Sequence, residues 1–330
     1  MAPESLACRR GVALTSSTET RLDHQAVLDA AQRIASQITR TPVLRSDALN
    51  QLSGAELHFK CENLQTGGAF KLRGASNAVL QLSEAQRARG VCTHSSGNHG
   101  AALARIARQL GIACTVVVPE GASARKLQNM RSLGAQLQSC AATQLAREQG
   151  VADLISRSGA VEIPPYDDAR IIAGQGTAAL EFLDQVADLQ AMIVPVGGGG
   201  LLAGSLLAAD GQCPVFGAEP AGADDTARSI AGQSRVLEHQ PETICDGLRA
   251  LVGIRNLQII SAGVAAVLTV DDEQTRAAMR LIWDELKLVV EPSAAVTLAA
   301  VLAYPASFAG RRVGLILSGG NVDLDTLTWQ

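Results

Sequence analysis

The segment AMIVPVGGGGLLAG (residues 191–204) joins a wholly apolar run to four consecutive glycines and then to a stretch of helix-forming residues. An apolar run without alternation is typical of a strand that is buried on both faces of a parallel sheet. Glycines at the turn from such a strand into a helix let backbone N–H groups surround a phosphate, and the helix dipole favours the anion. The segment therefore predicts an α/β fold with a phosphate site at the turn from Gly197 to Gly200.

The same alternation continues through the rest of the chain. Short apolar or β-branched runs are separated by longer Ala-, Leu- and Arg-rich stretches, such as 97–111 and 272–288, that have helical character. Strands alternating with helices indicate βαβ units and a mostly parallel sheet with helices on both faces. The candidate strands are 55–62, 114–120, 191–196, 214–220, 265–270 and 312–318.

The length of 330 residues predicts two domains, at roughly 100–200 residues for each, or one large α/β unit. The segment 90–167 has a βαβ pattern of its own, and we expect it to form a small domain. Residues 23–89 and 168–330 then make up the large domain, which contains the predicted phosphate site. Residues 1–22 are expected to be a loose N-terminal extension before the first helix.

Composition excludes several functional classes. The formal net charge is -4 and the sequence has no basic block, which argues against nucleic acid as a partner. No apolar run approaches the ~20 residues of a membrane span, and the N-terminus lacks a signal-peptide core. Seven scattered cysteines without a CxxC motif are typical of thiols in a reducing compartment, so we expect a cytoplasmic protein. The five histidines lack the spacing of a zinc site.

A lysine stands in the first of three further turns that follow predicted strands, the position where ligands bind in open α/β sheets. Lys71 lies among glycine, alanine and phenylalanine in 66–74, where a helix begins. An apolar setting and the positive end of a helix both disfavour the ammonium form, so this lysine is a candidate nucleophile. The alternative is an ordinary surface lysine at a helix start.

The other two turns carry small polar residues. In 93–100, hydroxyls and backbone N–H groups at a helix start could grip a carboxylate, although Ser96 or Asn98 could simply cap the helix. In 317–321, Ser318 could bond a ring nitrogen, or the segment could be a common turn.

The tetraglycine itself admits a second interpretation. Gly198-x-Gly200-x-x-Ala203, followed by Glu219 at a strand end, satisfies the loose dinucleotide-binding fingerprint.

Taken in order, the lysine, the serine–asparagine loop, the glycine turn and the last serine resemble the fold-type II pyridoxal-phosphate enzymes. Within them, the resemblance is to the serine racemase and serine/threonine dehydratase family, whose two-lobed α/β fold is like that of the tryptophan synthase β subunit. Eight motifs in family order, over about residues 23–329, carry this resemblance and displace the dinucleotide interpretation. They are Thr41-Pro42, Phe70-Lys71-Leu72-Arg73-Gly74, Ser95-Ser96-Gly97-Asn98-His99-Gly100, Ala173-Gly174-Gln175-Gly176-Thr177, Gly197-Gly198-Gly199-Gly200, Ala218-Glu219-Pro220, Glu291-Pro292-Ser293 and Ser318-Gly319-Gly320-Asn321.

The resemblance implies a role for each residue around pyridoxal 5'-phosphate. Lys71 would hold the cofactor as a Schiff base and take the Cα proton of the substrate. Phe70 would flank the ring, and Asn98 would bond its 3-hydroxyl. Ser318 would face the ring nitrogen and leave it unprotonated, and the weaker electron sink that results suits prompt loss of a β-leaving group. The phosphate would be bound by Gly197, Gly198, Gly199 and Gly200.

The implied reaction is β-elimination of L-serine or L-threonine, an amino-acid substrate, to a 2-oxo acid and ammonia. Ser95, Asn98 and His99 would cradle the substrate carboxylate. Ser96 stands where racemases of this family keep a hydroxyl on the opposite ring face, so serine racemisation stays open. Two departures from the family are Ala69, where serine is usual, and Ala250, where serine racemase has a serine on the substrate side.

Two arginines keep a different substrate open. Arg147 matches an arginine at the mouth of the racemase active site, and Arg249 is a second cation nearby in the geometry of that family. Together they could bind a second carboxylate, which makes the alternative a 3-hydroxyaspartate dehydratase (ammonia-lyase). A third hypothesis, a nucleotide-binding or regulatory protein without catalysis, is disfavoured by the intact Lys71, Asn98 and Ser318.

The resemblance also implies a divalent-cation loop and a homodimer. Glu219, the Ala223 carbonyl and Asp225 would supply oxygen ligands for Mg²⁺ or another divalent cation. The alternative is that these acids are solvated residues after a strand.

Overall fold

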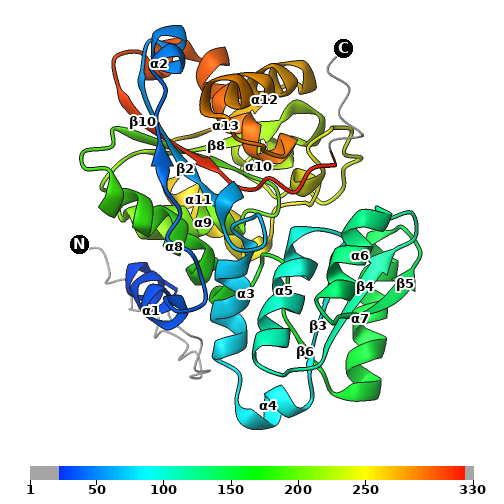
Figure 1. The fold of residues 1–330 in the computed structure, drawn as a ribbon. Helices are drawn as coiled ribbons and strands as arrows, with labels where there is room; N and C mark the ends of the chain where they lie inside the picture. The colour runs from blue at the N-terminus through cyan, green and yellow to red at the C-terminus, as the bar shows by residue number, and fades with distance from the viewer. Residues whose placement is uncertain (1–21, 324–330) are drawn as a thin grey trace, which may run out of the picture.

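The computed structural model describes residues 22–323, which form two separate sheets flanked by helices (Figure 1). Residues 1–21 of the predicted extension and residues 324–330 lie outside this range. The larger sheet has the strand order β1-β2-β10-β7-β8-β9 and the smaller one the order β5-β4-β3-β6. The strands are β1 (Val43–Leu44), β2 (Glu56–Cys61), β3 (Val91–His94), β4 (Cys114–Pro119), β5 (Gln136–Cys140), β6 (Val161–Glu162), β7 (Ala191–Pro195), β8 (Val215–Pro220), β9 (Ala266–Val270) and β10 (Arg312–Leu317).

Helices connect successive strands, as βαβ units require. Every described strand pair is parallel except β1 with β2. The helices are α1 (His24–Ile34), α2 (Asp47–Ser53), α3 (Lys71–Leu80), α4 (Glu84–Ala88), α5 (Asn98–Gln109), α6 (Ala124–Ser132), α7 (Gln144–Ser158), α8 (Ala169–Gln185), α9 (Gly200–Ala209), α10 (Asp225–Ala231), α11 (Ile254–Gly263), α12 (Asp272–Leu286), α13 (Pro292–Ala303) and α14 (Pro305–Phe308). None of these helices combines the length and the apolar character that crossing a bilayer requires.

The six-stranded sheet is buried on both faces. Side chains alternate along each strand, so Ile193 of β7 packs with α2, α12 and α13, whereas Met192 and Val194 pack with α8, α9 and α11. The two helical layers explain why β7 is apolar at every position.

The four-stranded sheet has its own two layers. Val116 and Val118 of β4 pack with α3, α5 and α6, and Val117 packs with α7 on the opposite face. Its strands all lie between residues 91 and 162, whereas those of the larger sheet come from 43–61 and 191–317. The exact domain boundaries at 89/90 and 167/168 stay predictions.

The predicted fold class is confirmed, and all six candidate strands are present within two residues of the expected ends. The two strands β1 and β6 were not expected, because each has only two residues and thus no readable pattern.

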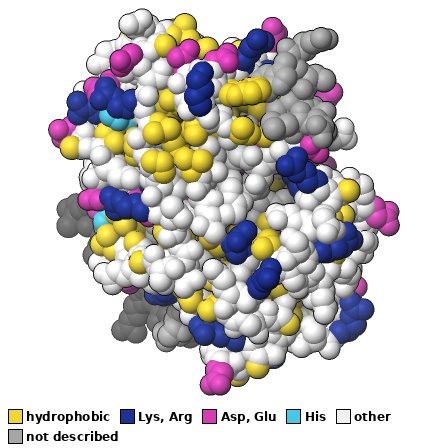
Figure 2. Space-filling view, viewed as in Figure 1, with side chains coloured by type: hydrophobic (Ala, Val, Ile, Leu, Met, Phe, Trp, Pro, Cys, Tyr) yellow, Lys and Arg dark blue, Asp and Glu magenta, His cyan; other side chains and the backbone are white. Residues whose placement is uncertain are grey.

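The charged side chains do not gather in one place on the face of the molecule that Figure 2 shows. Lys and Arg side chains are dispersed over that face, with Asp and Glu among them (Figure 2).

A buried ionic network fixes the start of α3. The Arg73 guanidinium donates to both oxygens of Glu62, at 2.7 and 2.8 Å, and to both oxygens of Glu181 in α8, at 2.9 and 2.8 Å. Lys60 of β2 donates to Glu181 and Gln185, each at 2.8 Å. Arg73, Lys60 and Glu62 are completely buried.

The charges of this network offset one another. Burial acts to lower the pKa of Arg73, but the carboxylates of Glu62 and Glu181 outweigh burial and raise this pKa. Burial likewise opposes ionisation of Glu181, yet Arg73 and Lys60 hold its pKa below the usual value. Removing one member therefore leaves an uncompensated charge in a dry interior.

We expect Glu62→Gln to lower the free energy of unfolding by about 3–5 kcal/mol, because Arg73 loses a charged partner where water cannot replace it. Chemical denaturation measures the change. Arg40→Ala is the matched control, since it breaks the Arg40–Asp184 pair, whose side chains are 55% and 71% exposed, and should cost less than about 1 kcal/mol. Equal effects of the two substitutions would contradict the structural role of the network.

Candidate active site

The turn that holds Lys71 lies against the turn after the last strand. Ala69 forms an isolated antiparallel bridge with Gly319, and the Phe70 N–H donates to the Ser318 carbonyl at 3.0 Å. The Asn321 side chain donates to the Gly67 carbonyl at 2.8 Å. The predicted turns 66–74 and 317–321, about 250 residues apart in the chain, therefore lie side by side and form one side of the candidate site.

Lys71 is the first residue of α3, and its ammonium is poorly solvated. Its Nζ donates to the Pro165 carbonyl at 3.0 Å and lies 4.9 Å from the centre of the Phe70 ring. Burial lowers the pKa of the Lys71 amine to about 8, against the opposing attraction of the Glu291 carboxylate. A sizeable fraction of this amine is thus unprotonated near neutral pH, as a nucleophile requires. This setting does not fit the alternative of an ordinary surface lysine.

The tetraglycine lies beside Tyr166, the residue after Pro165. A Cβ on Gly198 would come within 2.4 Å of the Tyr166 ring, and Gly199 has a φ of +90°, so neither position can take a larger residue without strain. Gly253 N–H and the Asn256 amide hold the Gly198 carbonyl, at 3.1 and 2.6 Å.

The N–H groups of the tetraglycine remain available. None of those of Gly197 to Gly200 donates to another described residue. They open the α9 helix, where the dipole favours an anion. The dipeptide Pro165-Tyr166 therefore lies between the Lys71 amine and a group of free amides suited to a phosphate.

The serine–asparagine loop opens α5 without a side-chain cap. The N-cap is Gly97, so the alternative that Ser96 or Asn98 caps this helix is wrong. Ser95 instead accepts from the Gly97 N–H at 3.3 Å, and Ser95 and Ser96 are half-buried. The first-turn N–H groups of α5 are thus free to bind a carboxylate.

His99 points away from this loop. Its Nε2 must donate to the Ile163 carbonyl, at 2.9 Å, because a carbonyl only accepts. Burial, and secondarily the charge of Lys71, lowers the pKa of His99 to about 3, so the ring is neutral. A neutral ring with Nε2 protonated has no donor left at Nδ1. The expected contact with a substrate carboxylate is therefore open only to the His99 backbone N–H.

Glu291 is a site residue to which the sequence assigned no role. Both of its oxygens accept from Asn98 Nδ2, at 2.9 and 3.0 Å, and the Asn98 carbonyl oxygen accepts from Asn321 at 2.9 Å. Burial raises the pKa of Glu291 to about 7, although the bond from Asn98 counteracts this rise. The sequence pointed to Glu291 only through its place in the motif Glu291-Pro292-Ser293. No pattern in the sequence pointed to Pro165 or Tyr166.

The two arginines have different surroundings. Arg147 of α7 lies close enough to His94, at the end of β3, to lower the pKa of this histidine, although burial is the larger cause. Ser95 follows directly, so Arg147 is near the predicted carboxylate site. Arg249 instead donates through Nε and Nη2 to the Thr243 carbonyl. No contact among the described residues joins the two arginines.

The predicted cation loop is buried. Both Glu219 oxygens accept backbone N–H groups, from Thr226 at 3.1 Å and Ala227 at 2.9 Å, and burial raises the pKa of Glu219 to about 8. Asp225 accepts from the Val252 N–H at 2.8 Å, while its Oδ1 is buried without a hydrogen bond and lies 3.5 Å from His239 Nδ1. Over residues 22–323, no three His, Cys, Asp or Glu side chains converge as metal ligands. The alternative of solvated acids does not fit, since Glu219 and Asp225 are fully buried.

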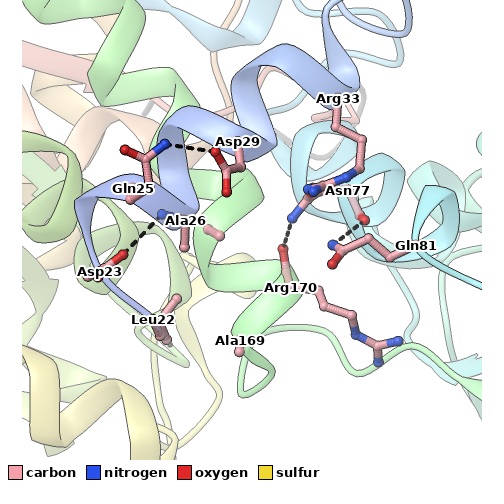
Figure 3. Close-up of a pocket in the computed structure, with 11 residues that line it drawn as sticks. Leu22, Asp23, Gln25, Ala26, Asp29, Arg33, Asn77, Gln81, Ala169 and Arg170 are labelled. Atoms are coloured by element: carbon pink, nitrogen blue, oxygen red, sulfur yellow. Dashed lines mark hydrogen bonds between the residues drawn. The ribbon is translucent and has the colours of Figure 1, made fainter. Parts of the chain in front are cut away.

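Two surface hollows lie elsewhere. One of about 310 Å³ lies between α1, α3 and α8, and its polar groups are bonded to one another, as in Gln25–Asp29 and Arg33–Asn77 (Figure 3). The other, of about 420 Å³, is lined by Arg45, His58 and Arg312 around Glu56. Neither includes a predicted site residue.

Comparisons with known proteins agree with this geometry. The model of the pyridoxal-phosphate dependent enzyme family matches residues 34–319. The chain is 44% identical over 312 residues to beta-hydroxyaspartate dehydratase of Paracoccus denitrificans (strain Pd 1222), which covers 93% of this chain and 98% of that protein. It is 44% identical over 310 residues to serine racemase of Dictyostelium discoideum, covering 92% and 95% of the two chains.

Solved structures have the same fold. The crystal structure of the Dictyostelium discoideum serine racemase aligns with a TM-score of 0.87, over 92% of this chain and 99% of that one. A threonine deaminase from T.th., 40% identical, aligns with a TM-score of 0.86 over 91% of this chain and 98% of that one.

Proposed function

The chain belongs to the family of pyridoxal-phosphate-dependent enzymes, and from this premise we propose that it deaminates a hydroxy amino acid such as L-serine or L-threonine by β-elimination. Water is lost first and is taken up again when the unsaturated amine hydrolyses, so that the net products are a 2-oxo acid and ammonia. The observation that carries the proposal is the Lys71 amine, which has a lowered pKa and donates to the Pro165 carbonyl. The next residue, Tyr166, lies against the tetraglycine, whose amides have no partner among the described residues.

The residues present fit pyridoxal phosphate. Lys71 would hold its carbonyl carbon covalently, and the N–H groups of Gly197 to Gly200 would bind its phosphate. Phe70 is next to Lys71, and Ser318 is tied to Phe70 by a backbone bond, so both are placed to meet the ring. When bound, the cofactor supplies an electron-withdrawing ring that stabilises negative charge at the substrate Cα.

The chain's own residues supply binding and proton transfer. The uncapped start of α5, with Ser95 and the N–H groups of Asn98 and His99, would orient the substrate carboxylate. The Lys71 amine, once released from the cofactor, would take the proton from Cα, because its lowered pKa suits a base near neutral pH. Ser96 would act on the opposite face. If its hydroxyl returns a proton there, serine racemisation accompanies elimination.

Lys71→Ala should abolish 2-oxo acid release from L-serine and L-threonine, and it should remove the visible absorbance of the loaded protein. The chain has four lysines, so borohydride reduction followed by peptide mass spectrometry assigns the attachment site. Lys287→Ala, on the exposed end of α12, is the control and should keep both properties. Cofactor fixed to another lysine, or activity retained by Lys71→Ala, would overturn the proposal.

A second candidate substrate, 3-hydroxyaspartate, is favoured by the position of Arg147. The charge of this guanidinium is felt by His94, the residue before Ser95, so Arg147 is on the side of the carboxylate site, where it could bind a second carboxylate. The relative from Paracoccus denitrificans is named for this substrate class. Arg249 is the weaker partner, since its Nε and Nη2 both donate to the Thr243 carbonyl, whereas Arg147 donates to the Thr143 carbonyl through Nε alone, at 3.4 Å.

We expect Arg147→Ala to lower kcat/KM for 3-hydroxyaspartate by about 10- to 100-fold, as loss of a charge-assisted contact implies, and to change that for L-serine less than about threefold. Steady-state assays of 2-oxo acid release with both substrates measure the change in kcat/KM for each. Arg157→Ala is the matched control, because Arg157 is on the same helix and bonds Gln138 instead. Parallel losses for both substrates would exclude Arg147 as a specificity residue.

We also propose that Glu219, the Ala223 carbonyl and Asp225 bind Mg²⁺ or another divalent cation. The support is chemical: the nearby charge of Asp225 adds to the cost of ionising the buried Glu219, and the Asp225 Oδ1 accepts no hydrogen bond, with His239 Nδ1 3.5 Å away. A cation would offset both charges and accept the free oxygen as a ligand.

Addition of MgCl₂ should then raise the thermal midpoint, by an amount that corresponds to about 2.7 kcal/mol when the cation is at 100 times its Kd. Asp225→Asn should lose this rise. Asp224→Asn should keep the rise in the thermal midpoint, because the Asp224 carboxylate pairs with Arg228 at the surface. A rise that Asp225→Asn retains would place the cation elsewhere.

We further propose a cytoplasmic homodimer. Of the eight large hydrophobic side chains that are exposed among the described residues, seven lie outside 90–167, so a partner is expected to cover the part with the six-stranded sheet. Six described cysteines are free, in keeping with a reducing compartment. Sedimentation at monomer mass and recovery outside the cytoplasm would contradict these two points.

A further inference from the structure

The Asn98 amide is part of a chain of side-chain bonds that joins α5 to both the start of α13 and the end of the larger sheet. Its Nδ2 donates to the carboxylate of Glu291, the residue before α13. Its Oδ1 accepts from Asn321 Nδ2 at 2.9 Å, and the same nitrogen of Asn321 donates to the Gly67 carbonyl at 2.8 Å.

We propose that Glu291 and Asn321 are positioning residues that fix which end of the Asn98 amide faces the cofactor. They make Asn98 a hydrogen-bond donor, and never an acceptor, toward the ring 3-oxygen. This inference rests on the proposed function, because the ring oxygen is the ligand of Asn98.

The acceptors at both ends of the chain decide the orientation. The Gly67 carbonyl can only accept, so the Asn321 amide must turn its nitrogen toward it. That nitrogen has a second N–H, which must meet the oxygen of Asn98.

Glu291 fixes the other end of the Asn98 amide. An ionised carboxylate has no donor, so the Asn98 nitrogen must face it. Flipping Asn98 would set its oxygen against the carboxylate and its nitrogen against the Asn321 amide nitrogen. Both contacts would be lost at once at a half-buried position.

One N–H of Asn98 remains for a ligand. The two oxygens of Glu291 belong to one carboxylate and lie in nearly the same direction from Nδ2, at 2.9 and 3.0 Å, so a single N–H serves both. The second N–H diverges from the first, and no described residue accepts it. Glu291 also acts on the Lys71 amine, which places this network beside the atom that would hold the cofactor.

A donor at the 3-oxygen favours the ionised form of that oxygen, in which the lysine-bound cofactor absorbs at longer wavelength. If the amide could flip, an oxygen would sometimes face the ring oxygen and favour its protonated form, which absorbs at shorter wavelength. The ratio of the two absorbance bands therefore reports the orientation of Asn98 directly.

The test is Glu291→Gln, which keeps the size of the side chain but can both donate and accept, so that it no longer dictates the orientation. We expect the apparent Kd of the apoprotein for pyridoxal phosphate to rise about tenfold, and the share of the shorter-wavelength band to increase at fixed pH. Asn321→Ala removes the other constraint and should shift the bands in the same direction. Glu291→Asp, which restores an acceptor, should recover part of the wild-type spectrum.

Asp246→Asn is the matched control. It removes a nearby negative charge that also raises the pKa of Glu291, but Asp246 pairs with Lys126 and does not contact Asn98. Its spectrum should remain that of the wild type. A spectrum that shifts equally with Asp246→Asn would show a general effect of charge and overturn the proposal, as would unchanged spectra in both Glu291→Gln and Asn321→Ala.

Failure of the proposed function is recognised separately. If borohydride fixes no cofactor to Lys71 in the wild-type protein, the function itself is wrong. If Lys71 is labelled and Glu291→Gln binds and absorbs like the wild type, only the positioning role is wrong.

Discussion

The position of the reactive amine depends on a guanidinium two residues further along the chain. Arg73 is completely buried and cannot lose its charge, so folding must bring Glu62 and Glu181 to it. Glu62 follows β2 and Glu181 belongs to α8. Because Arg73 bonds all four oxygens of these carboxylates, the start of α3 is fixed relative to the six-stranded sheet and α8. Lys71 inherits this rigidity, because a helix that is held at its third residue cannot swing at its first.

The second constraint is the close approach of three helices. A Cβ on Gly174 of α8 would lie 2.7 Å from the Gly74 Cα of α3, and one on Gly176 would lie 2.5 Å from the Gly204 carbonyl of α9. Two glycines in one helix therefore dock the helix that begins with Lys71 and the helix that begins with the glycine turn. The packing of α3, α8 and α9 thus determines how far the Lys71 amine lies from the tetraglycine N–H groups proposed to bind phosphate.

What the sequence could predict is what local pattern encodes. The apolar run of β7 indicates a strand buried on both faces, and glycines indicate a turn that side chains cannot enter. Neither pattern shows which carbonyl lies opposite a side chain. The Pro165 carbonyl at Lys71, the Ile163 carbonyl that turns His99 inward and the Thr243 carbonyl that holds Arg249 are tertiary contacts with main-chain groups, which every residue possesses. Capping by Ser96 or Asn98 was wrong for the related reason that Gly97 can take the N-cap position without any side chain.

Under the proposed function, the elements that would carry the reaction differ from the one that would select the substrate. The tetraglycine and Ser318 follow strands of the six-stranded sheet, and Lys71 begins α3, which packs between α8 and the four-stranded sheet. The buried charges around Arg73 and the glycine contacts of α8 fix Lys71 relative to the tetraglycine. Arg147 is on α7, which covers the outer face of the four-stranded sheet and takes part in neither constraint. A substitution on α7 can therefore change the charge offered to a substrate side chain while the amine, the phosphate site and their spacing stay as they are.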